Sequence, residues 1–462
     1  MDLDEDAARD NPVVLSSWFL AHGLGGRSDL PVPMVLAQYG AAVALIFSFA
    51  ALRAFWRTPR LEHAGAGHGR PLPAAAQRLA DAPATRAGLR ALGLLLAGIT
   101  LAAAALGPDD PVANPAPTWL YIWFWVGLVP ASLLFGPAWR LLNPLRTLSA
   151  GLDRLRGRPG GAVRELPAGL GYWPAAASLA VFAWLELVYA DASLPTTVLA
   201  FLLGYGLVHL WASMVYGQAW FARGDGFEVY STLLASLCPF GRRRDGRLVV
   251  RNPLAGLAGI DVAPGLVAVV CVLLGGAAFD GLARTRWWAS VTGDRGEHVD
   301  LLLGTAGLAA AVGFVAVTYL AATRTGQRYR RVRVAGPAED RLDRRFVHTL
   351  LPIAVGYTLA HYFSLLVLEG QNGYIRASDP FGRGWDLFGT AGWVQNPVAV
   401  STATIALVQV TAIVAGHLVG VVAAHDRAMA TFRGRDRLRG QYPLFATMVC
   451  YTVGGIALLV GR

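Results

Sequence analysis

Four ionisable side chains lie inside long apolar stretches of the sequence: Glu186, His209, His361 and His417. An ionisable group in such a stretch is costly to bury, and it commonly marks a functional site. Imidazole and carboxylate groups together are ligands for Zn, Fe or Mn. The same two groups also form general acid–base pairs. These residues are therefore the first candidates for chemistry.

Depth along the chain selects the most promising pair. At about 1.5 Å per residue, His361 lies about 22 Å from the start of its apolar stretch, and Glu186 lies about 21 Å from the start of its own. We therefore predict that these two side chains approach each other, with Glu369 and Asp379 at the mouth of the same pocket. Glu369 follows His361 by about 12 Å of helix rise, so the two bind one metal only if the helix ends between them.

A divalent metal, namely Zn, Fe, Mn or Cu, is the expected cofactor. The sequence offers five candidate ligands, which are His361, Glu186, His22, His209 and His417. His22 would chelate copper through its amine and ring if the chain were cleaved before it. The structural alternative for His209 and His417 is a hydrogen bond to a neighbouring helix. No H-E-x-x-H, Walker or G-x-S-x-G motif narrows the choice.

Composition indicates the elements that must position these residues. Of the 462 residues, 55% are apolar and only 15% are charged. The apolar residues form blocks of roughly 20, the length of a membrane-spanning helix. The sequence thus predicts an all-α integral membrane bundle of about ten spans. The expected spans are Pro33–Phe55, Ala87–Leu106, Thr118–Trp139, Tyr172–Ala190, Pro195–Tyr216, Val262–Asp280, Val299–Ala322, Phe346–Leu368, Val398–Ala423 and Tyr442–Val460.

Arginine sets the expected orientation. The formal charge is +10 and the sequence contains no lysine, so all 40 basic residues are arginine. Most of them fall in alternate gaps, which follows the positive-inside rule and argues against a nucleic-acid partner. Both termini are then outside, in a bacterial cell membrane whose lipid bilayer is the principal partner. The arginine-rich cytoplasmic loops are 53–90, 140–171, 217–261, 323–345 and 424–441, within a single membrane domain of residues 33–460 that follows an extracytoplasmic segment, residues 1–32.

Three shorter features refine this picture. Phe227–Phe240 is apolar but too short to span, and we expect an interfacial or re-entrant helix there. Asn143-Pro144 and Asn252-Pro253 each have the Asn N-cap and first-turn Pro that begin a helix. Gly416 and Gly420 form a G-x-x-x-G pair that favours close helix packing.

Several segments together resemble a family of actinobacterial multi-pass membrane proteins. They are Ala21–Pro33 (AHGLGGRSDLPVP), Ala360–Gln371 (AHYFSLLVLEGQ), Ser378–Thr390 (SDPFGRGWDLFGT) and Gly416–Ala428 (GHLVGVVAAHDRA). Some members of that family are named fenitrothion hydrolases. The resemblance implies hydrolysis of an organophosphate, assisted by a metal or by a base.

Three functions follow as hypotheses. The first is a membrane-embedded hydrolase acting on an ester or organophosphate at an outer His/Glu/Asp pocket. The second is a transporter of a proton, cation or metal ion that uses the buried His and Glu residues. The third is a membrane scaffold or assembly protein. An enzyme needs its ligands to converge on one pocket, whereas a transporter needs a polar path toward His209 and His417.

Overall fold

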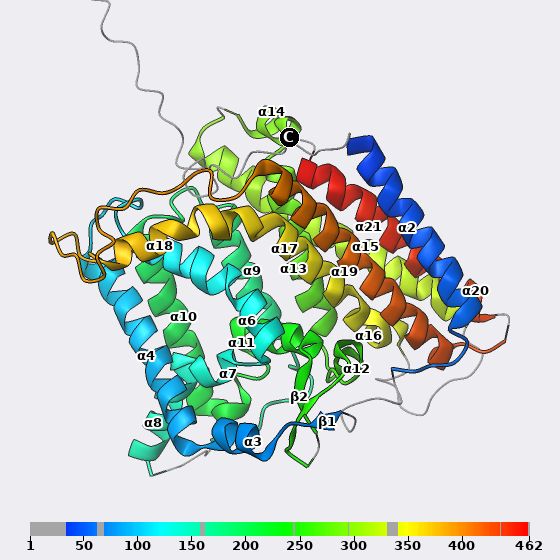
Figure 1. The fold of residues 1–462 in the computed structure, drawn as a ribbon, viewed down its shortest axis with the longest axis horizontal. Helices are drawn as coiled ribbons and strands as arrows, with labels where there is room; N and C mark the ends of the chain where they lie inside the picture. Colours follow the sequence, from blue (N-terminus) through cyan, green and yellow to red (C-terminus); the bar gives the residue numbers. More distant parts are fainter. Residues whose placement is uncertain are drawn as a thin grey trace, which may run out of the picture.

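The chain folds almost entirely into helices (Figure 1). The computed structural model describes residues 34–61, 69–157, 162–243, 245–293, 295–329, 341–434 and 436–460. The all-α class predicted from the sequence is thereby confirmed. The expected N-terminal segment, residues 1–32, lies outside the described residues. The longer helices are α2 (Met34–Phe55), α4 (Pro83–Leu106), α9 (Trp173–Leu187), α10 (Pro195–Tyr216), α13 (Leu266–Ala283), α15 (Glu297–Gln327), α17 (Leu351–Leu368), α19 (Thr402–Thr431) and α21 (Tyr442–Val460).

Short helices and turns connect these longer helices. The short α-helices are α3 (Ala74–Asp81), α5 (Ala116–Thr118), α6 (Leu128–Phe135), α7 (Trp139–Leu142), α8 (Pro144–Leu155), α11 (Gly226–Leu234), α12 (Pro253–Ala258), α14 (Arg286–Thr292), α16 (Leu342–Phe346), α18 (Gly370–Ala377) and α20 (Asp436–Arg439). The other helical pieces are the π-helix η1 (Trp119–Val126) and the 3-10 turns η2 (Gly217–Ala219), η3 (Ala235–Leu237) and η4 (Val347–Leu350).

Within the described ranges, eight helical stretches are long and apolar enough to cross a membrane. They correspond to eight of the ten expected spans. The two others, α9 and α21, do form helices, but neither is among the eight, and α9 has only 15 residues. The chain is thus a multi-pass helical membrane protein. The eight stretches are Val35–Phe55, Pro83–Leu106, Ala116–Phe135, Pro195–Ala219, Leu266–Ala283, Glu297–Gln327, Leu342–Ala377 and Thr402–Thr431.

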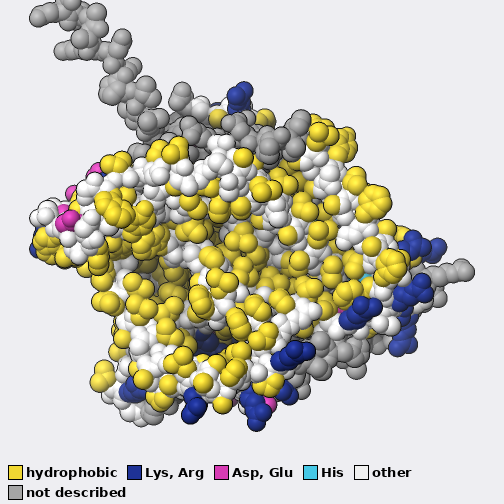
Figure 2. Space-filling view, viewed as in Figure 1, with side chains coloured by type: hydrophobic (Ala, Val, Ile, Leu, Met, Phe, Trp, Pro, Cys, Tyr) yellow, Lys and Arg dark blue, Asp and Glu magenta, His cyan; other side chains and the backbone are white. Residues whose placement is uncertain are grey.

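The surface has the polarity of a membrane protein (Figure 2). Large apolar side chains such as Phe47, Leu207 and Val317 are exposed on the long helices. On the face shown, apolar side chains cover the middle, while arginine side chains gather along the lower and right-hand edges. An apolar belt bordered by charge is what a bilayer requires of a bundle surface.

Two predicted helix starts are confirmed. The Asn143 side chain caps α8 by accepting hydrogen bonds from the amides of Leu145 and Arg146. Asn252 accepts from the Leu254 amide in the same way at the start of α12. Each cap satisfies amides that have no partner within the helix.

Helix α11 lies inside the bundle, not on its surface. It begins at the Asp225 N-cap and packs against α6, α7 and α9. All of its residues except Thr232 are buried. Of the two alternatives for this segment, the interfacial one does not fit such burial. The helix is a short insertion into the bundle, as in a re-entrant segment.

Helices α17 and α19 pack closely, and glycine makes this possible. A Cβ atom added to Gly416 would lie 2.5 Å from the Pro352 carbonyl oxygen, and one added to Gly356 would lie 2.4 Å from the Ala412 carbonyl oxygen. Gly420 approaches the Thr349 carbonyl in the same way. The close packing predicted around Gly416 and Gly420 is therefore confirmed.

One small antiparallel sheet joins two arginine-rich loops. Its order is β1 (Arg70–Pro71), β3 (Leu248–Val250) and β2 (Phe240–Arg242). The Arg242 guanidinium donates to Asp81 at 2.9 Å, which ties β2 to the end of α3. Arg242, the first of three consecutive arginines in this loop, therefore pairs within the protein. The third, Arg244, lies outside the described residues.

Candidate functional site

The most polar site within the apolar bundle is centred on Asp280 of α13. The Nε2 atom of His361, from α17, lies 2.5 Å from the Asp280 Oδ2 atom. Arg284, one turn after Asp280, reaches back with Nε at 3.1 Å from Oδ1 and its terminal nitrogen at 3.3 Å from Oδ2. Asp280 and His361 are 1% and 3% exposed, so this is an ionic contact removed from solvent.

Glu186 of α9 joins the same group through a tyrosine. The Tyr362 hydroxyl, next to His361 on α17, makes side-chain hydrogen bonds with both Glu186 and Asp280. One hydroxyl has a single proton to donate, so the two carboxylates compete for it. We call Glu186, Asp280, Arg284, His361 and Tyr362 the buried ionic cluster.

The direct pairing of Glu186 with His361, expected from their equal depth, needs a correction. Helix α13 packs against both α9 and α17, and its Asp280 is the side chain that contacts His361. Glu186 reaches the cluster by way of Tyr362 instead. Counting along each helix placed Glu186 and His361 at the right height, but the carboxylate that contacts His361 comes from α13, between the two helices.

The charge balance of the cluster depends on where one proton lies. Arg284 neutralises Asp280, because the two form a paired cation and anion. Glu186 and His361 then remain, and together they are uncharged when Glu186 is protonated or form an ion pair when His361 is protonated. Moving one proton between them exchanges these two states, so the arrangement is suited to holding and passing a proton.

Glu369 and Asp379 lie beyond this cluster. Helix α17 continues unbroken to Leu368, so Glu369 is about 12 Å of helix rise above His361 and cannot share a metal with it. Its carboxylate makes a side-chain hydrogen bond with Gln395. Asp379 accepts hydrogen bonds from the Arg383 and Gly384 amides at 2.8 and 2.7 Å, and these bonds stabilise the turn formed by residues 379–384.

The electrostatics of Asp379 fit that structural role. Burial acts to raise the pKa of Asp379, but hydrogen bonds from the backbone amides of Arg383 and Gly384 outweigh it. The pKa therefore lies below its ordinary value, and the carboxylate is stabilised in its charged form.

Of the candidate metal ligands, Glu186 and His361 belong to the buried ionic cluster, whereas His209 and His417 have other partners. His209 accepts from the Trp220 indole at 3.0 Å and packs on Tyr205. The Nδ1 atom of His417 is 2.8 Å from the Ile413 carbonyl. His22 lies outside the described residues. Across the described ranges, no group of three or more His, Cys, Asp or Glu side chains is arranged to hold a metal ion.

A second polar group sits at the start of α11. Arg146 binds Glu228 with two hydrogen bonds, at 2.9 and 2.6 Å. Asn143 donates to Asp225 at 2.7 Å, and the Tyr205 hydroxyl donates to the same carboxylate at 2.6 Å. We call Asn143, Arg146, Tyr205, Asp225 and Glu228 the α11 cluster.

Helix α11 connects the two clusters. Its Tyr230 makes a side-chain hydrogen bond with Thr358 on α17 and interacts electrostatically with Glu186. Tyr230 follows Glu228 by two residues, so the two side chains point to different faces of the helix. Tyr205 packs on His209, with ring centroids 4.2 Å apart. Helix α11 thus carries one side chain near each cluster.

Sequence reasoning named only part of this arrangement. Asp280 was named as the last residue of the expected span Val262–Asp280, and Arg284, Tyr362, Asp225 and Glu228 were not singled out. One signal was present, because Asp280 and Arg284 are four residues apart and such a pair meets on one helix face.

Comparison with known proteins identifies no relative of this chain. No family model, no curated protein and no solved structure matches the chain. The functional argument therefore depends on the two clusters and on the residues that link them.

Proposed function

We propose that the chain is a proton-coupled carrier with about ten spans, both termini outside, in the cell membrane of a bacterium. The observation that supports this most directly is the buried ionic cluster, in which Asp280 pairs with Arg284 and contacts His361. Ionisable groups inside membrane-spanning helices are rare, usually pair with one another, and often belong to proton relays.

The relay has a defined order. His361 passes its proton to the Asp280 carboxylate, Tyr362 exchanges protons with the two carboxylates, and Glu186 receives it. Tyr230 on α11 is the next hydroxyl beside this path, because it interacts electrostatically with Glu186. The inserted helix resembles the broken helices that form ion sites in transporters, since both place a helix end inside the bundle.

The experiment measures proton flux in liposomes that contain the full-length protein and a trapped pH indicator. We expect His361→Gln and Glu186→Gln each to slow the flux by about 100-fold, the typical contribution of one proton-transfer group. Glu369→Gln is the matched control, because Glu369 is on the same helix as His361 but outside the cluster. Equal flux through wild-type protein and His361→Gln would rule the relay out.

A hydrolase is the second candidate, and the His361–Asp280 contact favours it. A carboxylate that orients an imidazole makes it a general base, which could activate water against an ester or organophosphate. The family resemblance implies this reaction. A divalent metal does not fit the cluster well, because Arg284 already neutralises Asp280 and its cation would repel a second one. Any hydrolysis would therefore use the base.

One set of variants separates the candidates. Release of product from a phosphotriester and from a carboxylic ester is measured with wild-type protein, His361→Gln and Glu369→Gln. Hydrolysis that is lost only in His361→Gln, without proton flux, identifies the enzyme. Absence of both activities in wild-type protein favours the scaffold hypothesis.

A further inference from the structure

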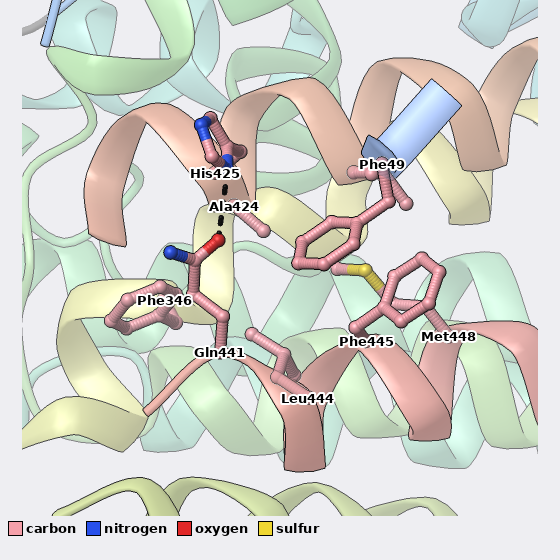
Figure 3. A pocket seen from close by; sticks show the side chains of 9 residues that line it. Phe49, Phe346, Ala424, His425, Gln441, Leu444, Phe445 and Met448 are labelled. Atoms are coloured by element: carbon pink, nitrogen blue, oxygen red, sulfur yellow. Dashed lines mark hydrogen bonds between the residues drawn. The ribbon is translucent and has the colours of Figure 1, made fainter. Parts of the chain in front are cut away.

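His425, near the end of α19, is held between two hydrogen-bond acceptors. Its Nδ1 atom is 2.9 Å from Oε1 of Gln441, and its Nε2 atom is 2.9 Å from the Trp56 carbonyl oxygen. The ring is 2% exposed. Figure 3 shows the Gln441 contact next to the apolar side chains of Phe49 and Leu444. His425 therefore touches the segment after α2 and the residue before α21.

The orientation of Gln441 is fixed independently. Its Nε2 atom donates to the Arg437 carbonyl at 2.5 Å, so its oxygen faces His425. The Trp56 partner is a carbonyl oxygen, which can only accept. A neutral imidazole has one N–H and one bare nitrogen, whereas an imidazolium has two N–H donors. Only the doubly protonated ring satisfies both contacts.

Asp426 supplies the matching negative charge. Its carboxylate accepts from the Trp56 indole at 2.9 Å, from the Arg60 amide at 2.6 Å and from the Leu61 amide at 3.1 Å. The segment after α2 thus gives its carbonyl to His425 and its N–H groups to Asp426. His425 therefore contacts a carbonyl oxygen of this segment, and the adjacent Asp426 accepts hydrogen bonds from its N–H groups.

A small cavity lies beside the ring. Of the nine residues that line it, His425 and Gln441 are the polar ones, and Phe49 meets His425 edge to face with ring centroids 6.0 Å apart. Ionisable side chains on the elements around His425 include Arg53, Arg57, Arg60, Asp343, Arg344, Arg345, His348, Asp426, Arg427, Asp436, Arg437, Arg439 and Tyr442.

We propose that His425 is a protonated latch that ties the inner ends of α2, α19 and α21 together and opens when the proton leaves. Loss of one proton to water leaves a nitrogen lone pair facing an oxygen, so either the Gln441 contact or the Trp56 contact breaks. The segment after α2 or the start of α21 is then released from α19. The latch stands apart from the buried ionic cluster and does not depend on the proposed carrier activity.

The first test uses wild-type protein in lipid bilayers with ¹⁵N-labelled histidine. Because both ring nitrogens face acceptors, we expect both His425 nitrogens to be protonated at acid pH, with the latch closed, and one to be bare at alkaline pH, with the latch open. His417, on the same helix but with Ile413 as its single observed acceptor, is the internal control and should carry one proton, on Nδ1. His425→Gln identifies the signal. A singly protonated His425 at acid pH overturns the proposal.

The second test measures the distance between spin labels at Thr58→Cys and Arg439→Cys, with the three native cysteines replaced. The distance distribution should be narrow at acid pH and broaden as pH rises. His425→Gln should be broad throughout, and His417→Gln should respond as wild type does. A wild-type distribution that ignores pH, or a narrow one in His425→Gln, contradicts the latch. The first test stays decisive if a variant fails to fold.

Discussion

Asp280 contacts Arg284, His361 and Tyr362, and its loss should therefore cost more than one hydrogen bond. Asp280→Asn leaves Arg284, whose side chain is 18% exposed, as an uncompensated cation. Breaking a fully buried pair typically destabilises by about 3–5 kcal/mol, and we expect a smaller loss here. We expect a clear fall in the thermal unfolding midpoint of the detergent-solubilised protein. The double variant Asp280→Asn/Arg284→Gln removes both charges and should recover much of that loss.

The control for this pair is Arg86→Gln. Arg86 also bonds an aspartate, Asp81, but both side chains are about half exposed, and exposed pairs contribute about 0–1 kcal/mol. A double variant as unstable as Asp280→Asn alone would show that Arg284 is not the source of the penalty.

Asp379 gives a pH-dependent prediction. Its lowered pKa means that the charged carboxylate stabilises the 379–384 turn above the ordinary pKa of 3.8, and that this stability is lost as pH falls through the folded value. A fluorotryptophan signal from Trp385 should stay constant from neutral pH down to about 4 and shift below it. Asp379→Asn should abolish that shift. A transition well above this range would implicate another group.

At the residue scale, the sequence predicted which polar side chains are buried but not what they bind. Glu186 and His361 could be placed by counting along a helix, because rise per residue is constant. Their partners could not, since Asp280 reaches His361 from a helix about 80 residues away in the chain. Contacts between helices depend on which helices are neighbours, and hydropathy alone does not encode that.

At the scale of elements, the contact between α17 and α19 gives a sharp mutational test. Gly416→Ala places a Cβ atom 2.5 Å from the Pro352 carbonyl oxygen, so the helices must separate. We expect a lower unfolding midpoint and a lower yield of folded protein. Gly98→Ala is the matched control, because a Cβ there meets nothing within 4 Å.

The control variant should be neutral or more stable, since alanine favours a helix over glycine by about 1 kcal/mol. An unchanged midpoint in Gly416→Ala would mean that the two helices can part at no cost.

Elements that follow from local sequence were predicted well. The Asn caps of α8 and α12 were predicted correctly, because an N-cap depends only on the side chain and the next few residues. The π-helix η1 was not, since the sequence of Trp119–Val126 reads as an ordinary apolar span. Its Trp119 and Trp123 indoles donate to the carbonyls of Gly373 and Gly370 at 2.9 Å. Such distant partners can favour an altered winding that local propensity does not reveal.

At the scale of the whole molecule, the arginine distribution predicts the topology. Reporter fusions after Asp245 and Gly434 should read cytoplasmic, and fusions after Ser290 and Gly392 should read external. Three of these positions lie in loops or turns, and Ser290 lies in the short helix α14. One reversed reading would break the alternation and, with it, the proposed outer location of both termini.

The architecture as a whole was predictable in its class and in most of its helices, because apolar length and charge bias act over single segments. The inserted α11 was predicted only as one of two alternatives. Its burial depends on a cavity that α6, α7 and α9 build together, and no one of those helices encodes it alone.

The shortness of α9 has a consequence for the bilayer. Its 15 residues extend about 22 Å, against a hydrocarbon thickness of about 30 Å. Such hydrophobic mismatch thins the lipid locally and draws headgroups and water inward. Glu186 is the residue before the last one in that helix. The membrane should therefore dimple beside this carboxyl, which would let water approach it from the side and not only along the bundle axis.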